Sequence, residues 1–443
     1  MKKQYARNDN LEYRILDLWL KGKSNREIQE TLLPVETARL AEGQQSSRKF
    51  QKYTSYLKRK LETYLVLQFL EQHPQEKSLI LLQVLSQKGW HGSFKKEWKK
   101  GKTIQEQATE PSHHREYEHL RLGYNHFHRI ADQEGEDLLP TIFDKLDQYW
   151  ASEKYQHLLG FLHKRRNQNG LPYEFPTDLD LLFTLTAPET ALGKLPEIQM
   201  MRQICRAQMG IEATDYEALA RQLRKVRPRL SQNASQSLFT GILHRFMLEF
   251  NQDRSEENAR RLYLWYVWGF RQDLILRYGQ LLPGHYKNFL GAALSLKRYP
   301  QMERWLKELT PLLPASRREE LHRLLYAAFL FEKGELKEVL ELRLFPFHFP
   351  SDEISVRFYQ IKAAVMLNER KNIPHDLAAI HARLKRGNNL GEHQIVVHAQ
   401  RLALMRKFLQ AKSPSQKEEM KKALQHQAPN PDTQWMLEHL WAV

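Results

Sequence analysis

A cluster of histidines is the first feature of the sequence that could support chemistry. It consists of His113, His114, His119, His126 and His128. Imidazole binds transition metals well, but a metal site needs several converging ligands and neighbouring groups that orient them. His119 and His126 are seven residues apart and would share one face of a helix. The nearby carboxylates are those of Glu116 and Glu118. We expect surface or half-buried histidines here and no metal site.

Gly101-Lys102-Thr103 imitates the end of a phosphate-binding loop. Such a loop needs a glycine five residues before Gly101, where this chain has Lys96, and a strand before it, where this chain has a polar stretch. The motifs HExxH, GxSxG, GxGxxG and CxxC are absent from the sequence. These motifs position nucleophiles, metals or cofactors in many enzymes. The sequence therefore predicts a non-enzymatic protein without a cofactor.

The distribution of positive charge points to a different chemistry, the binding of anions. The chain has a formal net charge of +16, and residues 1–110 contain 21 Lys and Arg against 13 Asp and Glu. Half of the excess therefore lies in the first quarter of the chain. A surplus of this kind is the electrostatic footprint of nucleic-acid binding, although a solvated basic surface gives the same composition.

Two stretches combine these cations with apolar residues. The candidate nucleic-acid contacts are Arg48, Lys49, Lys52, Arg59 and Lys60 in the first stretch, and Lys95, Lys96 and Lys99 in the second. In the second stretch, Trp90, Phe94 and Trp98 recur every four residues, which indicates a basic amphipathic helix. Such a helix could contact nucleic acid, an anionic surface or an acidic partner. Alternatively, its aromatic rings dock on the protein and its lysines face solvent.

The first stretch also has two interpretations. Helices expected at residues 11–20, 24–33 and 50–70 could form a helix-turn-helix whose last helix lies against DNA. However, the connection between the second and third helices is much longer than the turn of that motif. The third helix also carries an apolar stripe, at Phe50, Tyr53, Leu57, Leu61, Tyr64 and Leu65. We therefore favour a helix that docks by this stripe and leaves its basic face in solvent.

The elements that position these residues are predicted to be helices. Alternating Val, Ile and Thr runs bounded by Asn-Gly or Asp-Gly turns are absent, so few strands are expected. In a capping box, a hydroxyl and a carboxylate three residues later satisfy free amides of the first helical turn. Four such boxes indicate helix starts, at Ser24/Glu27, Thr214/Glu217, Ser316/Glu319 and Ser415/Glu418. The aromatic run of residues 263–270 covers several sides of a helix, which favours burial over a stacking platform.

The strongest internal signal is a repeat of about 35 residues. Its three copies are Leu290, Ala292, Ala293 and Leu296; Leu325, Ala327, Ala328 and Phe331; and Ile361, Ala363, Ala364 and Leu367. Val397, Ala399 and Ala403 form a fainter fourth copy. A turn and a second apolar helix follow each block, and a helix–turn–helix period near 34 residues is typical of tetratricopeptide arrays. Paired alanines let neighbouring helices approach closely.

These residues also carry a family resemblance. The stretch from residue 281 to residue 342 resembles an uncharacterised tetratricopeptide-like helical-repeat family of Bacteroidota. The matching positions are Tyr286, Lys287, Asn288, Trp305, Pro311, Leu313 and Pro314. Residues 50–70 and 146–166 are similar to other helices of the same family. The turns at residues 298–300 and 370–372 depart from its usual Gly-Asp/Glu-Tyr pattern. The resemblance implies a fold but no activity.

Together these patterns predict an all-α protein with a tetratricopeptide-like solenoid. We expect a basic N-terminal helical module in residues 1–100, a middle helical region in 114–252 and helical repeats in 253–443, with a polar linker at 101–114. The expected function is a scaffold that binds an unknown protein partner in the groove of the repeats. The candidate partner-binding residues are Tyr286, Lys287, Asn288, Arg323 and Tyr326. The alternative is a nucleic-acid-binding or regulatory protein that uses the basic module.

Compartment and membrane topology follow from simpler features. Cys205 is the only cysteine, so an internal disulfide is excluded. The start of the chain is polar and lacks the apolar segment of a signal peptide. The longest strongly apolar run, residues 262–270, is too short to span a bilayer. We therefore expect a cytoplasmic protein without membrane insertion.

Overall fold

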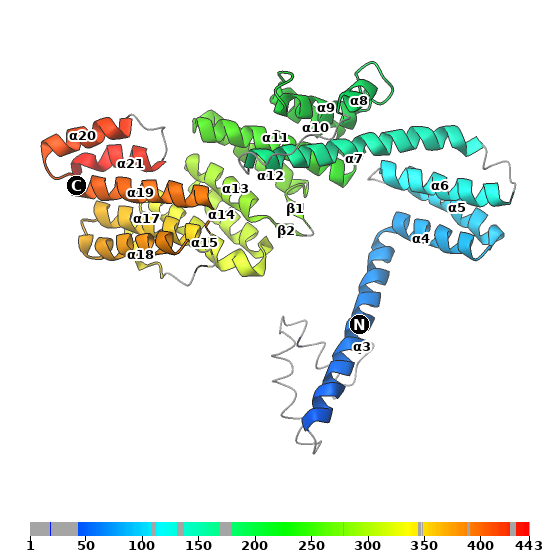
Figure 1. The fold of residues 1–443 in the computed structure, drawn as a ribbon, viewed down its shortest axis with the longest axis horizontal. Helices are drawn as coiled ribbons and strands as arrows, with labels where there is room; N and C mark the ends of the chain where they lie inside the picture. Colours follow the sequence, from blue (N-terminus) through cyan, green and yellow to red (C-terminus); the bar gives the residue numbers. More distant parts are fainter. Residues whose placement is uncertain are drawn as a thin grey trace. The chain divides into compact units, whose positions relative to one another are not determined.

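The structure is a computed structural model of the 443-residue chain. It describes residues 43–107, 112–130, 137–167, 179–277, 279–343, 347, 349–387, 390–425 and 431–442, together with residue 18. The described chain is almost entirely helical (Figure 1), and its two short strands, β1 (Leu276–Arg277) and β2 (Gln280–Leu281), form one antiparallel pair. The prediction of an all-α protein is confirmed. Of the three helices of the candidate helix-turn-helix, those expected at residues 11–20 and 24–33 lie outside the described residues apart from residue 18, and the one expected at residues 50–70 is part of a described helix.

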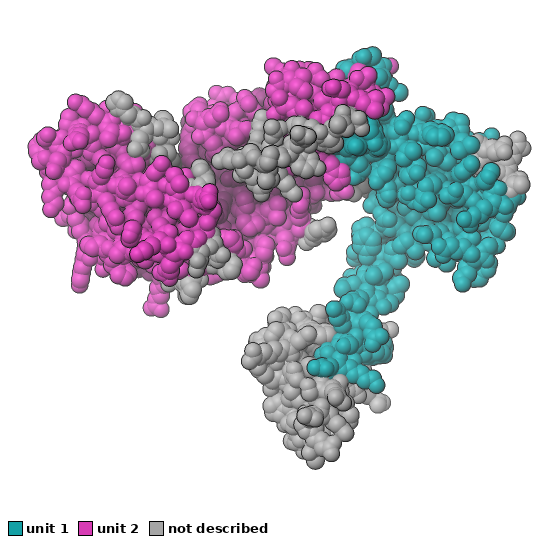
Figure 2. All heavy atoms as spheres, in the orientation of Figure 1, with its two compact units in different colours: residues 1–154, 188–192, 228–231 teal, residues 155–187, 193–227, 232–443 magenta. Residues whose placement is uncertain are grey.

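The chain divides into two compact units (Figure 2). Unit 1 comprises residues 1–154, 188–192 and 228–231, and unit 2 comprises residues 155–187, 193–227 and 232–443. The long helix α7 (Leu139–Asn167) contributes its first part to unit 1 and its second part to unit 2. Both units are built from helices that pack on helices.

Unit 1 contains a small helical module. Besides the first part of α7, its helices are α3 (Gly43–Gln72), α4 (Pro74–Gln87), α5 (His91–Glu106) and α6 (His113–Arg129). α4 packs on both α5 and α6, and the shared core contains Leu82, Leu85, Phe94 and Phe127. α5 continues through the buried Gly101. The polar stretch expected to be a linker therefore begins inside a helix.

The first part of unit 2 is a group of helices around an aromatic core. They are the second part of α7, α8 (Leu179–Leu185), α9 (Pro196–Gln208), α10 (Tyr216–Val226), α11 (Gln232–Gln252) and α12 (Glu256–Arg271). α9 and α10 both pack on α11, and α11 packs on α12. Tyr263, Trp265 and Tyr266 of the aromatic run are buried. A Cβ on Gly269 would lie 2.3 Å from the Phe239 ring, so the two helices meet closely at this glycine. The aromatic run packs in the core, as predicted.

The second part of unit 2 consists of successive helix pairs. They are α13 (Pro283–Ser295) with α14 (Tyr299–Leu309), α15 (Ala315–Lys333) with α16 (Leu336–Glu341), α17 (Pro350–Met366) with α18 (Ile373–Arg386), and α19 (Glu392–Gln410) with α20 (Pro414–Gln425), followed by α21 (Pro431–His439). The first helix of each of the first three pairs packs on the first helix of the next pair. These contacts place segments about 35 residues apart side by side.

The repeated alanines are buried in this part of the chain. The buried pairs are Ala292 and Ala293 in α13, Ala327 and Ala328 in α15, and Ala363 and Ala364 in α17. The fourth copy behaves differently, because Val397, Ala399 and Ala403 of α19 are exposed. α19 instead buries His398, Leu402, Met405 and Phe408. Its apolar stripe is therefore rotated away from the face that the repeat pattern predicted.

Helix starts follow proline and side-chain caps more than the predicted capping boxes. Pro74, Pro196, Pro283 and Pro350 open α4, α9, α13 and α17, where the missing amide hydrogen has no consequence. Two caps lie close to the predicted positions. Asp215, one residue after Thr214, accepts from the amides of Glu217 and Ala218, and Ser413, two residues before Ser415, pairs with Gln416. Ser316 was predicted as a cap, but it lies within α15, which begins at Ala315. Ser24 lies outside the described residues.

The first helix of each of three pairs ends on a left-handed residue. These residues are Lys297 (φ 52°), Gly334 (φ 87°) and Asn368 (φ 59°). The amide of the following residue bonds back into the last turn of the helix in each case, which is the pattern of a Schellman cap. The remaining turns are short 3-10 segments, η3 (Arg227–Arg229), η4 (Thr310–Leu312), η5 (Arg370–Asn372) and η6 (Leu440–Ala442). The departure from the family turn pattern at residues 370–372 thus coincides with η5.

Candidate interaction surfaces

α5 separates its aromatic rings from its lysines. Phe94 is fully buried and Trp98 is half-buried, whereas Lys96 and Lys99 are exposed. Trp90, the residue before α5, is 60% exposed. Lys96 and Lys99 form no ion pair with any residue that the structure describes, although Lys100 lies 3.5 Å from Glu97. The helix docks through two of its three predicted aromatic residues and presents a basic face to solvent.

Two histidines of α6 hold the aromatic rings of α5 in place. The His126 ring stacks on Phe94 at 3.7 Å, and the His119 ring stacks on Trp98 at 5.4 Å. Burial lowers the pKa of His119 to about 4, with a further contribution from the charge of Lys102. Both histidines are therefore neutral rings in a core at neutral pH. Within the described chain, no three His, Cys, Asp or Glu side chains are arranged to hold a metal ion.

α3 carries the other predicted nucleic-acid contacts. Lys52, Arg59 and Lys60 are exposed, and Lys60 lies over the Tyr56 ring at 4.8 Å. Arg48 and Lys49 belong to the first turns of α3, and their side chains lie outside the described residues. The Lys95 side chain on α5 is half-buried over the Phe127 ring.

The apolar stripe of α3 is only partly covered. Leu57 is 1% exposed and Leu61 is half-buried, but Tyr64 and Leu65 are 40% and 52% exposed. The docking expected for this helix therefore reaches its middle turns and not the turns that follow.

The candidate partner-binding residues of α13 take part in packing within unit 2. The Tyr286 side chain is fully buried, and its hydroxyl lies 2.9 Å from the Thr310 hydroxyl. Burial raises the pKa of Tyr286 to about 12. The Asn288 amide donates to the sulfur of Met247 at 3.4 Å. These side chains join α13 to its neighbours.

The candidate residues of α15 are also engaged within the unit. Arg323 is paired with Glu319 at 2.9 Å and donates to the carbonyl oxygen of Arg343. The Tyr326 ring is half-buried and stacks on the His322 ring at 5.7 Å. The function of all these residues in partner binding stays a prediction.

A buried carboxylate connects three successive helix pairs. Asp352, at the start of α17, is 2% exposed. It pairs with Lys287 of α13 at 2.5 Å and with Arg317 of α15 at 2.8 Å. The Arg317 guanidinium also lies 3.5 Å from the centre of the Phe349 ring. A carboxylate in a dry environment requires such partners, so this cluster fixes the relative position of the three helices.

A second, half-buried carboxylate attaches the C-terminal helix. Asp432 of α21 pairs at 2.5 Å with both Lys362 of α17 and Arg401 of α19. Burial alone would raise the pKa of Asp432, but the charges and hydrogen bonds of Arg401 and Lys362 outweigh it and hold the pKa at about 2. Burial lowers the pKa of Lys362, against the opposing charge of Asp432. Trp435, one turn after Asp432, is also buried.

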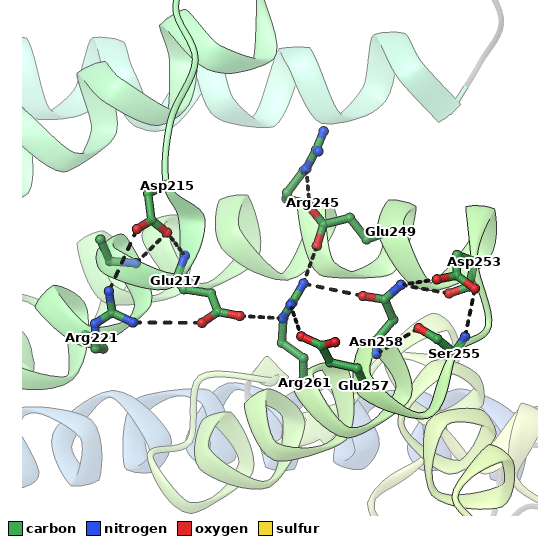
Figure 3. A network of polar contacts seen from close by, with 11 residues as sticks. Asp215, Glu217, Arg221, Arg245, Glu249, Asp253, Ser255, Glu257, Asn258 and Arg261 are labelled. Atoms are coloured by element: carbon green, nitrogen blue, oxygen red, sulfur yellow. Dashed lines mark hydrogen bonds and ion pairs between the residues drawn. The ribbon is translucent and has the colours of Figure 1, made fainter.

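A third cluster, around Arg261, binds α10, α11 and α12 together (Figure 3). Arg261 projects from the first turns of α12 and reaches Glu217 at 2.7 Å, Glu249 at 2.8 Å and Glu257 at 3.2 Å. Asp253 accepts from the Ser255 amide at the start of the same helix. The three glutamates come from three different helices. Local spacing in the sequence could suggest only the pair between Glu257 and Arg261, which are four residues apart.

Comparisons with protein-family models, curated proteins and solved structures find no match to this chain. None of the described helices combines the length and the apolarity needed to cross a bilayer.

Proposed function

We propose that this chain is a non-enzymatic interaction protein of the cytoplasm, in which residues 253–443 form a tetratricopeptide-like array that binds a protein partner. The buried alanine pairs support the array, because they recur at the same register in α13, α15 and α17, which pack on one another in succession. Repeat arrays of this kind present long continuous surfaces to partners. The single buried Cys205 accords with a reducing compartment.

The observation that carries the proposal is the bare stripe on α19. Val396 is 53% exposed, and Ala399 and Ala403 are exposed on the same side of the helix at three- and four-residue spacing. In α13, α15 and α17 the corresponding alanine pairs are buried. An apolar stripe at helical spacing suits a partner helix that packs alongside. The partner would thus continue the contact that the array makes between its own helices.

A pull-down from the native cell tests this proposal. The chain is compared with a Val396→Arg/Ala399→Arg variant, with Met366→Arg as the control because Met366 is also exposed, on α17. A protein that resists nuclease treatment, and that is lost only with the α19 variant, is the expected result. Equal recovery by all three chains would refute the assignment of α19, and recovery of no protein would refute the scaffold function.

The exposed lysines of α5 favour a second candidate, nucleic-acid binding by unit 1. Lys96 and Lys99 lie on one solvent face, and the exposed Trp90 offers a ring for stacking. Fluorescence anisotropy with labelled single- and double-stranded DNA and RNA would test it. The affinity of the natural chain should fall steeply as salt rises from about 50 to 200 mM. The affinity of the Lys96→Ala/Lys99→Ala variant should fall less steeply over the same range. Binding that does not change with salt would exclude this candidate.

A further inference from the structure

The last turns of α3 expose apolar side chains in every direction. Tyr64 is 40% exposed, Leu65 52%, Val66 58%, Leu67 57% and Phe69 49%. Successive residues of a helix point about 100° apart. The residues from position 64 to position 69 therefore surround the helix axis with apolar groups.

A helix that is apolar on all sides normally lies in an interior. The end of α3 is not buried, since the polar Gln68 and its apolar neighbours are all exposed. Ile80, Leu81 and Val84 of α4, which follows directly, are exposed as well. Isolated apolar residues on a surface need no explanation, but a contiguous group of this kind marks an interaction site.

We propose that this segment pairs with the same segment of a second copy of the chain, with the two α3 helices antiparallel and crossing near Val66. The charge of α3 decides the orientation. Arg48, Lys49, Lys52, Lys58, Arg59 and Lys60 all precede the apolar segment. A parallel pair would place these cations against their own copies, whereas an antiparallel pair moves the two basic stretches to opposite ends.

The antiparallel register also brings opposite charges together. If Val66 lies beside Val66 of the second copy, Lys60 lies opposite position 72 of the second copy. The second copy's Glu71 is the residue next to that position. Two-fold symmetry produces this contact twice. The basic stretches then extend away from the crossing, where they stay available to solvent or to an anionic partner.

The exposed area of the segment sets an upper limit on the size of such a pair. Five half-exposed side chains of this type leave on the order of 500 Å² of apolar surface in water. Because one partner helix covers one side of α3, the pair buries only part of this area, which is less than the roughly 800 Å² per partner of a standard interface. We therefore expect a weak dimer, with a dissociation constant in the micromolar range.

The first experiment measures the mass of the full chain by sedimentation equilibrium. At roughly 100 μM, above a micromolar dissociation constant, the mass should approach twice the 52.7 kDa of the chain. In a Leu65→Glu/Val66→Glu/Leu67→Glu variant the new residue, glutamate, is a good helix former. The helix should therefore persist, and the chain should be monomeric. The matched control is Leu181→Glu/Ile211→Glu/Leu264→Glu, whose three positions in unit 2 are 45–51% exposed, and it should dimerise normally. A monomeric natural chain, or a dimer that survives the α3 variant, overturns the proposal.

The second experiment tests the orientation by oxidative cross-linking. The only natural cysteine, Cys205, is fully buried, so any cross-linked dimer can be attributed to the introduced surface cysteine. Disulfides form only when the two Cα atoms are within about 7 Å. At least one of Leu65→Cys, Val66→Cys and Leu67→Cys should give a covalent dimer. Lys52→Cys should give none, because at 1.5 Å per residue it lies about 40 Å from its copy in the antiparallel pair. A Lys52→Cys cross-link would indicate a parallel pair and overturn the proposal.

A third measurement separates self-association from binding to a lipid surface. Vesicles of equal parts phosphatidylglycerol and phosphatidylcholine are mixed with the natural chain and with the α3 variant. Any co-sedimentation should be equal for the natural chain and the α3 variant, because both retain the same basic stretches. A chain that stays monomeric and binds these vesicles through the α3 segment would overturn the proposal and assign the segment to a membrane surface.

Discussion

α17 and α5 are both rich in charged residues, but they use their charges in opposite ways. In α17, Asp352, Glu353 and Lys362 are at most 4% exposed, and each has an oppositely charged partner. In α5, Lys96 and Lys99 face solvent without an ion pair to any described residue. The charges of α17 therefore fix the positions of helices, whereas those of α5 remain available for a ligand.

This contrast shows that a net charge alone does not locate a binding surface. Unit 2 contains many of the cations of the chain, and Arg261, Arg317 and Arg401 are among those committed to carboxylates. Such cations contribute to the composition but not to an accessible positive face. Substitution of a cation that is paired with a carboxylate should therefore change the stability of the fold, whereas substitution of Lys96 or Lys99 should change the binding of a ligand.

The largest effect is expected from Asp352→Ala. The substitution leaves the charges of Lys287 and Arg317 without their shared carboxylate, and breaking a buried pair by removing one partner costs about 3–5 kcal/mol. The free energy of unfolding, measured by urea titration and circular dichroism, should fall by this amount. A loss below about 1 kcal/mol would mean that the cluster behaves as a surface ion pair and would remove the contrast with α5.

The attachment of α21 should weaken in acid. The pKa of Asp432 is about 2 in the folded chain and 3.8 in its ordinary state. Asp432 therefore contributes about 2 kcal/mol of stability above pH 4, which is lost as the pH falls toward 2. Asp432→Asn removes this contribution, so the difference in unfolding free energy between the two chains should shrink over that range. A constant difference would contradict the assigned pairing.

The repeat supplies a matched pair of positions, one covered and one bare. Ala363→Leu places a larger side chain in a buried contact, and overpacking of this kind costs about 1–3 kcal/mol. Ala399→Leu, at the equivalent position of the fourth copy, adds the same atoms to an exposed face and should leave the urea midpoint unchanged. Equal destabilisation by both substitutions would show that α19 is covered like the other first helices.

The smallest effect on stability is expected in α5. Lys96→Glu/Lys99→Glu should leave the midpoint of urea unfolding unchanged, because neither side chain is paired with a described residue. Its effect should appear only in the binding of an anionic ligand. A clear loss of stability would place these lysines with the structural cations of α17.

Much of the packing could be predicted from the sequence because helical periodicity is local. The alanine pairs at residues 292–293, 327–328 and 363–364 are buried as their spacing indicates. The fourth copy failed because α19 carries two overlapping apolar stripes, and the sequence does not decide which one faces inward. The helix caps are displaced in a similar way, since Asp215 stands one residue after the predicted cap Thr214 and Ser413 stands two residues before the predicted cap Ser415.

The ion clusters could not be predicted in the same way. Lys287 and Asp352 are separated by 65 residues, and no local pattern relates two side chains at that separation. The sequence analysis predicts Lys287 as a partner contact, whereas the structure pairs it with the buried carboxylate of Asp352. The exposure of the last turns of α3 could not be predicted for a related reason. An apolar stripe in the sequence indicates that a helix can dock, but not whether a neighbouring helix covers the whole stripe.

The position of Asp352 has a consequence for the evolution of the chain. Helix pairs that contact only their neighbours can in principle be gained or lost as whole units. Loss of α15 and α16 would remove Arg317, and insertion of a pair before α17 would separate Lys287 from Asp352 by an additional helix. Either event would leave a buried charge without its partner. Unequal recombination is thus disfavoured between α13 and α17, and changes in the number of pairs are better tolerated outside this stretch.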